Sequence, residues 1–409
     1  MNKLLGVTLG VLTSVGGFVD IGDLVANSEA GARFGMRHAW VLLLGVIGIC
    51  AYAEMCGRVV AVSKRPVFDL IRERLGPRVA LANLVASYLV TVLTLGAELG
   101  GVALALQLLS GINYLVWLPL AGLVLWLALW RVKFERLERV LGLGGLVLIV
   151  FTLAALRLPA DWLGLSSQAI HIDPPSGENW GTYWFLAVAL FASAMMPYEV
   201  FFYSSGGVEE KWTAKELSRS RINVFVGFPL GGLLALSLML TAAEVFHPID
   251  VSVGQLSQVA LPPALAFGKI GLALAILGFF AATFGAAMET GLASAYTVAQ
   301  YFGWPWGKRV RPVQAARFHT VLLISVLLGV AILLTTIDPV QLTEYVLVFS
   351  AVTLPLTYLP ILVLANDRRY LGDKVNKRLA NAVGQIYLVV ILTAALAAIP
   401  LMILTGVGG

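Results

Sequence analysis

The sequence predicts an all-α polytopic membrane protein with about eleven transmembrane helices. Hydrophobic residues make up 59% of the 409 residues and charged residues only 12%, and the mean hydropathy is +0.88. Soluble domains carry about 25% charged residues. The apolar residues gather in runs long enough to cross a bilayer, which takes about 20 residues. We therefore expect residues 1–409 to form a single transmembrane domain with no large soluble part.

Eleven apolar runs are the expected spans. They cover residues 4–31, 39–63, 80–109, 114–131, 139–157, 183–206, 222–245, 263–302, 317–337, 342–365 and 380–405. The third and eighth runs are long, so we expect them to tilt or to extend beyond the membrane. Residues 66–75 are amphipathic and short, which is typical of an interfacial helix.

Two of these runs are interrupted by polar residues in mid-span. The first contains Gly16-Gly17-Phe18-Val19-Asp20-Ile21-Gly22-Asp23, and the sixth contains Ser193-Ala194-Met195-Met196-Pro197-Tyr198-Glu199. Breaks at corresponding positions of two halves indicate an inverted repeat with a binding site at the breaks. The expected repeats are residues 1–157 and 183–365, with 380–405 as an extra helix.

The distribution of charge predicts the orientation. A net charge of +5 first suggests nucleic-acid binding. However, nearly all basic residues fall in the alternate loops 58–78, 131–139, 211–221, 308–317 and 368–378. Excess Lys and Arg mark cytoplasmic loops, so we expect a cytoplasmic N-terminus, an extracytoplasmic C-terminus and no nucleic-acid partner. The compact chain suggests a prokaryotic inner or plasma membrane.

The breaks carry groups that could bind a cation. A carboxylate at membrane depth costs about 2.5–3.5 kcal/mol, so Asp20 and Asp23 are expected to line a cavity or an ion path. Pro197 lacks an N–H and leaves the Ser193 carbonyl free. The Met196 thioether is a soft ligand, and this donor set suits Mn²⁺ or Fe²⁺ better than Na⁺ or K⁺. The structural alternatives are a proline kink, a packed methionine, and Asp23 as the cap of the second half-helix.

These residues resemble the motifs of the natural resistance-associated macrophage protein (Nramp) family. Asp20-Ile21-Gly22-Asp23 is similar to its first-span motif Asp-Pro-Gly-Asn, and Met196-Pro197-Tyr198-Glu199 to its sixth-span motif Met-Pro-His-Asn. Segments 56–58, 69–74, 97–100 and 354–369 also resemble that family. The resemblance implies a LeuT-like fold and proton-coupled uptake of divalent transition metals. It further implies metal ligands at Asp20, Asp23, the Ser193 carbonyl and the Met196 sulfur.

The departures from the family motifs add acids and remove an imidazole. Tyr198 stands at the position where the family has His. Both Glu199 and Asp23 stand at positions where it has Asn, and Leu95 stands where the family usually has an acid. We therefore add Glu199 to the expected ligands. More oxygen donors favour harder ions, Mg²⁺ or Mn²⁺, whereas the retained methionine opposes a Mg²⁺ assignment.

Four further residues are candidates for proton coupling or for support of the ligands: Glu98, Tyr198, Glu289 and Arg58. Glu98 and Glu289 are acids within predicted spans, Tyr198 belongs to the sixth-span motif, and Arg58 lies at the end of the second span. Glu98 could carry protons, donate a hydrogen bond when protonated, or pair with Arg58. Glu54 lies one turn before Arg58 and is the other expected partner of that guanidinium.

The predicted function is secondary active import of divalent metal ions with proton coupling. The chain has no phosphate-binding loop and no Cys/His cluster, so we expect neither an enzyme nor a bound cofactor. The expected partners are the metal ion, protons and the bilayer. Three alternatives remain open: a passive or Mg²⁺-type uniporter of the same fold, an ion-coupled amino-acid or organic-solute transporter, and a receptor or scaffold with an inactive site.

Overall fold

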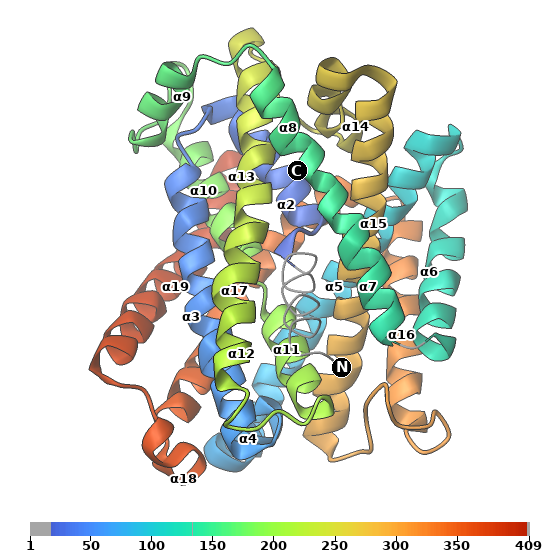
Figure 1. Cartoon of the computed structure of the whole chain (residues 1–409), viewed down its shortest axis with the longest axis vertical. Coiled ribbons are helices and arrows are strands. Elements are labelled where there is room, and N and C mark those ends of the chain that lie inside the picture. The colour runs from blue at the N-terminus through green and yellow to red at the C-terminus, as the bar shows by residue number, and fades with distance from the viewer. Residues whose placement is uncertain (1–17, 133, 407–409) are drawn as a thin grey trace.

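The computed structural model describes residues 18–132 and 134–406, and in this part of the chain the regular structure is entirely helical (Figure 1). Gly16, Gly17 and the start of the first predicted span lie outside the described residues. The helical structure of the described residues confirms the predicted all-α fold class. The division into two repeats stays a prediction.

The helices follow the predicted runs closely. They are α2 (Ile21–Phe34), α3 (Ala39–Ser63), α4 (Val67–Leu75), α5 (Pro77–Ser110), α6 (Tyr114–Arg131), α7 (Phe134–Gly145), η1 (Leu146–Leu148), α8 (Ile149–Arg157), α9 (Trp162–Ala169), α10 (Trp180–Ser193), α11 (Pro197–Glu209), α12 (Leu217–Ile222), η2 (Asn223–Gly227), α13 (Phe228–Val245), η3 (His247–Ile249), α14 (Leu256–Val259), α15 (Leu261–Phe302), α16 (Ala316–Leu334), α17 (Pro339–Ala365), α18 (Arg368–Leu371), η4 (Gly372–Lys374) and α19 (Arg378–Thr405). Ten stretches among the described residues are long and apolar enough to cross a membrane, and α2 belongs to the first predicted span.

Local sequence explains where these helices begin and end. Pro77 occupies the first turn of α5, where its missing N–H costs nothing, and Gly76 before it has φ 87°. Helix α4 confirms the short helix expected at residues 66–75. The loop at 158–182 contains α9, whose first turn is capped by the Asp161 side chain. The helix boundaries therefore differ from the predicted runs by only a few residues at most ends.

The broken sixth span lies at the centre of the molecule. In its most apolar stretch, 94% of the residues are buried by the rest of the protein, against 17% for α19 at the periphery. Helix α5 packs against α15, α16 and α17. A Cβ atom on Gly96 of α5 would lie 3.2 Å from the Gly329 carbonyl oxygen of α16, so this crossing depends on small residues.

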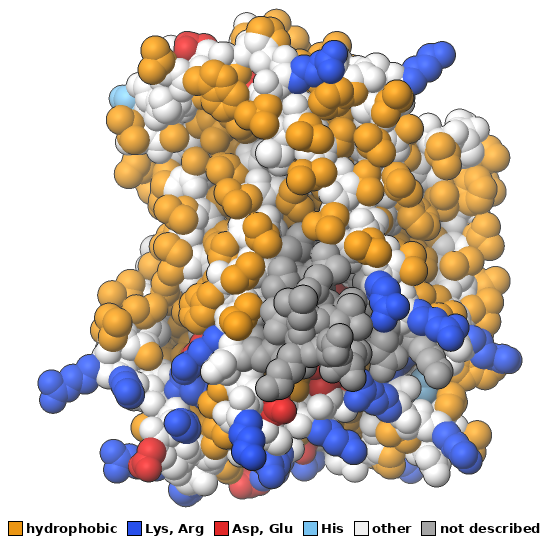
Figure 2. All heavy atoms as spheres, viewed as in Figure 1, with side chains coloured by type: hydrophobic (Ala, Val, Ile, Leu, Met, Phe, Trp, Pro, Cys, Tyr) orange, Lys and Arg blue, Asp and Glu red, His pale blue; other side chains and the backbone are white. Residues whose placement is uncertain are grey.

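Charged and apolar side chains separate along the long axis of the molecule. On the face shown in Figure 2, most Lys and Arg side chains lie at the end where Figure 1 places α4 and α18, and a hydrophobic band lies beyond them. A protein that crosses a bilayer needs such a band. The basic residues of separate loops thus gather at one end of the fold.

Candidate metal site

The first break lies immediately before α2. Phe18 is helical, Val19 and Asp20 are not, and α2 begins at Ile21. A helix start exposes backbone N–H groups that have no partner within the helix. Two carboxylates accept two of them here: Asp20 Oδ1 from the Asp23 N–H at 3.0 Å, and Glu98 Oε1 from the Ile21 N–H at 3.2 Å. Asp20, rather than Asp23, is therefore the cap of the second half-helix.

The second break separates α10 from α11. Helix α10 ends at Ser193 and α11 begins at Pro197. Because residue 197 is a proline, it has no N–H to donate to the Ser193 carbonyl, as the sequence predicts. Helix α3 packs closely against the break: a Cβ on Gly45 would lie 2.5 Å from the Ala194 Cβ.

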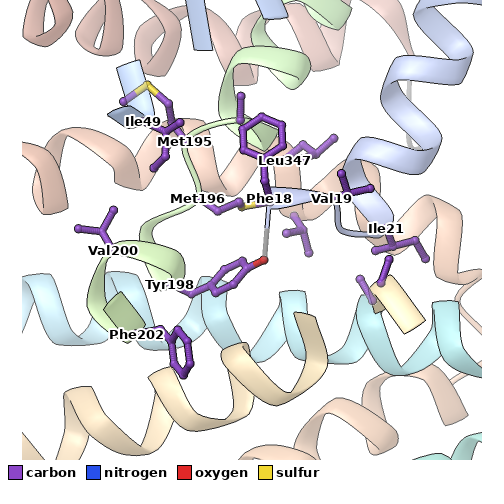
Figure 3. Close-up of a cluster of buried hydrophobic side chains, with 14 of the residues drawn as sticks. Phe18, Val19, Ile21, Ile49, Met195, Met196, Tyr198, Val200, Phe202 and Leu347 are labelled. Carbon is purple, nitrogen blue, oxygen red and sulfur yellow. The ribbon is translucent and has the colours of Figure 1, made fainter. Parts of the chain in front are cut away.

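The two breaks meet in the interior. Ser193 Oγ donates a hydrogen bond to Asp23 Oδ1 at 3.1 Å, and the Tyr198 hydroxyl donates to Asp20 Oδ2 at 3.4 Å. Figure 3 shows the Tyr198 hydroxyl directed toward the first break. A Cβ on Gly22 would lie 2.9 Å from Asp20 Oδ1 and 3.0 Å from Ser193 Oγ. Glycine at position 22 thus allows the two breaks to approach.

Met196 lies on the side of the second break that faces the first break. Its side chain points toward Phe18, while Met195 points away, beside Ile49 (Figure 3). The Met196 sulfur accepts a hydrogen bond from Ser350 Oγ of α17 at 3.3 Å. This bond orients the thioether, which is buried.

Several carboxylate oxygens are buried without a hydrogen-bond partner among the described residues. They are Asp23 Oδ2, Glu98 Oε2, both oxygens of Glu199 and, in α13, both oxygens of Glu244. A buried oxygen without a partner costs roughly 1–3 kcal/mol, so each such atom needs an explanation. Glu199 interacts electrostatically with Asp20, Asp23 and Glu289. A bound cation or a proton would relieve these charges.

Not every predicted residue joins this arrangement. Within the described residues no three His, Cys, Asp or Glu side chains converge closely enough to hold a metal. The groups that meet are instead Asp20, Asp23 and the hydroxyls of Ser193 and Tyr198. The Met196 side chain is directed toward Phe18 of the first break. Arg58 lies apart from them, where it donates to Glu54, the Lys374 carbonyl and Asn376.

Two supporting residues are absent from the sequence-based predictions. Asn27 donates its side-chain amide to both Asp23 Oδ1 at 3.1 Å and the Asp23 carbonyl at 3.0 Å. Its spacing of one helical turn from Asp23 is a signal that could have found it. Ser350 comes from a distant helix, and nothing local to residue 350 indicates its contact with Met196.

A helical bundle with two broken helices that meet at buried polar groups is typical of secondary transporters. The solved structures that this chain resembles place it among those with the LeuT fold. The manganese transporter of Eremococcus coleocola, solved with an aromatic bis-isothiourea compound, has a TM-score of 0.72 at 16% identity over 100% of this chain and 96% of its own. The nucleobase-cation-symport-1 transporter MHP1 has a TM-score of 0.61 at 15% identity over 96% and 91% of the two chains. At these identities the likeness shows the fold.

The chain belongs to the Nramp family. The family model "Natural resistance-associated macrophage protein-like" matches residues 10–400. A relative from Klebsiella pneumoniae named divalent metal cation transporter MntH is 24% identical over 90% of this chain and 87% of its own length. A relative of the same name from Acidiphilium cryptum is 25% identical over 65% of this chain, and that match spans only 63% of the relative's length.

Proposed function

We propose that this protein is a secondary active transporter that imports divalent metal ions, Mn²⁺ or a similar ion, with coupled proton movement. The observation that carries the proposal is that the two broken helices meet through hydrogen bonds of Ser193 to Asp23 and of Tyr198 to Asp20. Met196 points from the second break toward Phe18 of the first. Two carboxylates, a free carbonyl and a thioether match the ligand preferences of a borderline transition-metal ion. The names of the relatives, manganese transporter and divalent metal cation transporter, agree with this substrate class.

The metal ligands in this proposal are Asp20, Asp23, the Ser193 carbonyl and the Met196 sulfur, with Glu199 as an added acid. Asp23 Oδ2 is the buried oxygen left for the ion, since Asp23 Oδ1 accepts from Ser193 and Asn27. In transporters of this fold, a substrate carboxylate binds at half-helix N-termini. Acidic side chains at both breaks would repel it, which disfavours an amino-acid substrate.

Proton coupling is proposed to involve Glu98. One of its oxygens holds the Ile21 N–H and the other is buried without a partner in the described part of the chain. Carboxylates at membrane depth commonly serve as proton relays. Glu98 also links α5 directly to the first break, so its protonation can be transmitted to the metal ligands. Glu289 and Tyr198 are proposed to support this relay.

The proposed membrane is a prokaryotic inner or plasma membrane, with the basic end of the molecule and the N-terminus in the cytoplasm. The gathering of Lys and Arg at the end that holds α4 and α18 supports this orientation (Figure 2). In this proposal, inward transport moves the ion toward the basic end.

Uptake into proteoliposomes tests the proposal. Mn²⁺, Mg²⁺ and Ca²⁺ are supplied in parallel, and a pH-sensitive dye reports the internal pH. We expect Mn²⁺ entry with internal acidification, and Glu98→Gln should reduce the proton movement more than the metal movement. Metal entry without acidification, in both the wild type and Glu98→Gln, contradicts the coupling and supports the passive uniporter. The absence of entry for all three ions contradicts the substrate class.

A further inference from the structure

A groove lies at the basic end of the molecule, away from the candidate metal site. It has a volume of about 600 Å³ and is lined by residues of α4, α17, α18 and α19 and by the segment that joins α17 to α18. One end of the groove holds Arg74, Asp367, Arg368 and Arg369, and its wall includes Leu359 and Leu388. The groove therefore joins a charged end to an apolar wall.

An ion-pair clamp fixes two of its three guanidinium groups. The Asp367 carboxylate accepts from Arg74 Nε at 2.6 Å and from Arg369 Nη2 at 2.8 Å. These bonds, above all that from Arg369, hold the pKa of Asp367 well below its ordinary value, so the clamp persists at neutral and mildly acidic pH. Arg74 uses only its Nε–H in this bond, and a guanidinium carries five N–H donors. Both arginines thus keep N–H groups for an anion.

Arg368 supplies the third positive charge. Its side chain is exposed, and no hydrogen bond or ion pair connects its guanidinium to the described residues. Among the residues that line the groove, three guanidinium groups stand against one carboxylate, a net charge of +2. The nearby Glu73 carboxylate is paired with Arg65. Such a site is complementary to an anion, and the planar guanidinium fork matches the geometry of phosphate oxygens.

The apolar wall faces the region that lipid chains occupy. Leu359 of α17 is 45% exposed, and α19 is the least buried of the membrane-crossing helices in the described chain. In Figure 2 the hydrophobic band directly adjoins the cluster of Lys and Arg at the α18 end. A soluble anion would use only the charged end, whereas an amphipathic anion would use both parts.

We propose that this groove binds an anionic phospholipid, with its phosphate at Arg74, Arg368 and Arg369 and an acyl chain along Leu359 and Leu388. Basic pockets between membrane helices on the cytoplasmic side are suited to anionic headgroups. The assignment to the cytoplasmic leaflet uses the orientation proposed above. The binding itself does not depend on which ion the protein transports.

Native mass spectrometry of the full chain in detergent tests the proposal, with phosphatidylglycerol and phosphatidylcholine added in parallel. We expect one phosphatidylglycerol to be retained in preference to phosphatidylcholine. Arg368→Gln should lower its affinity about fivefold, the effect of one basic residue near a lipid surface. Because Arg368 has no described partner, this variant should fold normally. Arg311→Gln is the matched control, since Arg311 is exposed in the basic loop between α15 and α16, outside the groove.

Three outcomes would overturn the proposal. Equal retention of the two lipids shows that the groove does not select the headgroup. Equal effects of Arg368→Gln and Arg311→Gln show diffuse surface charge rather than a site. Displacement of phosphatidylglycerol by inorganic phosphate shows a site for soluble anions. Each is measured without transport, so a failure here is distinguishable from a failure of the proposed transport function.

Discussion

At the scale of single residues, Asp20 combines a structural role with the proposed binding role. Its Oδ1 caps α2 through the Asp23 N–H, and its Oδ2 accepts from Tyr198. A capping side chain contributes about 1 kcal/mol to stability. The partial positive charge at the start of α2 also favours a carboxylate there. This local stabilisation offsets part of the cost of an acid at membrane depth.

Met196 is the residue that should discriminate between soft and hard ions. Replacement by alanine removes the thioether, so Cd²⁺ affinity should fall about tenfold, equivalent to about 1.4 kcal/mol, while Mg²⁺ and Ca²⁺ affinities change little. Isothermal titration with each ion measures this. Met195→Ala is the matched control, because Met195 is equally buried but packs against Gly48 and points away from the first break. An equal loss for all ions in Met196→Ala would mean that Met196 is only packing.

At the scale of helices, much of the structure can be predicted from the sequence, because helix ends depend on local chemistry. Pro77 and Pro197 begin helices α5 and α11, and the apolar runs give the spans within a few residues. The contacts between helices cannot be predicted in this way. Asn27 is recoverable from its spacing to Asp23, but Ser350 reaches Met196 across 154 positions of sequence. The Glu98 bond to Ile21 likewise depends on how α5 packs.

The approach of the two breaks gives a prediction at this scale. In Gly22→Ala the new methyl group would displace the Asp20 carboxylate or the Ser193 hydroxyl, since it would lie within about 3 Å of both. Mn²⁺ affinity should therefore fall by at least about tenfold. Alanine favours a helix over glycine by about 1 kcal/mol, so weaker helix propensity cannot explain the loss.

Gly206→Ala in α11 is the control for that measurement, because a Cβ there would meet no atom within 4 Å. Its Mn²⁺ affinity should equal that of the wild type, and both variants are compared by Mn²⁺ titration and thermal unfolding. Unchanged Mn²⁺ affinity in Gly22→Ala would mean that Asp20 and Ser193 do not hold the ion together.

At the scale of the whole molecule, the orientation in the membrane is testable by cysteine labelling. Single cysteines at Asn113 and Ser167 should react with an impermeant reagent from outside, and one at Ser218 only from inside. All three positions are exposed. The native Cys50 and Cys56 are buried and should remain unlabelled. Reversed labelling would contradict the cytoplasmic N-terminus and the proposed direction of transport.

The most direct test of the central claim, that the two breaks bind the transported metal, is Mn²⁺ uptake by Asp20→Asn in proteoliposomes. Asparagine caps helices as well as aspartate, so this variant removes the charge and keeps the structural role. Asp338→Asn makes the same change at the cap of α17, where Asp338 Oδ1 accepts the Val340 N–H. We predict that Asp20→Asn is folded but loses uptake, while Asp338→Asn transports normally. Normal uptake by Asp20→Asn would contradict the account and place the metal pathway elsewhere.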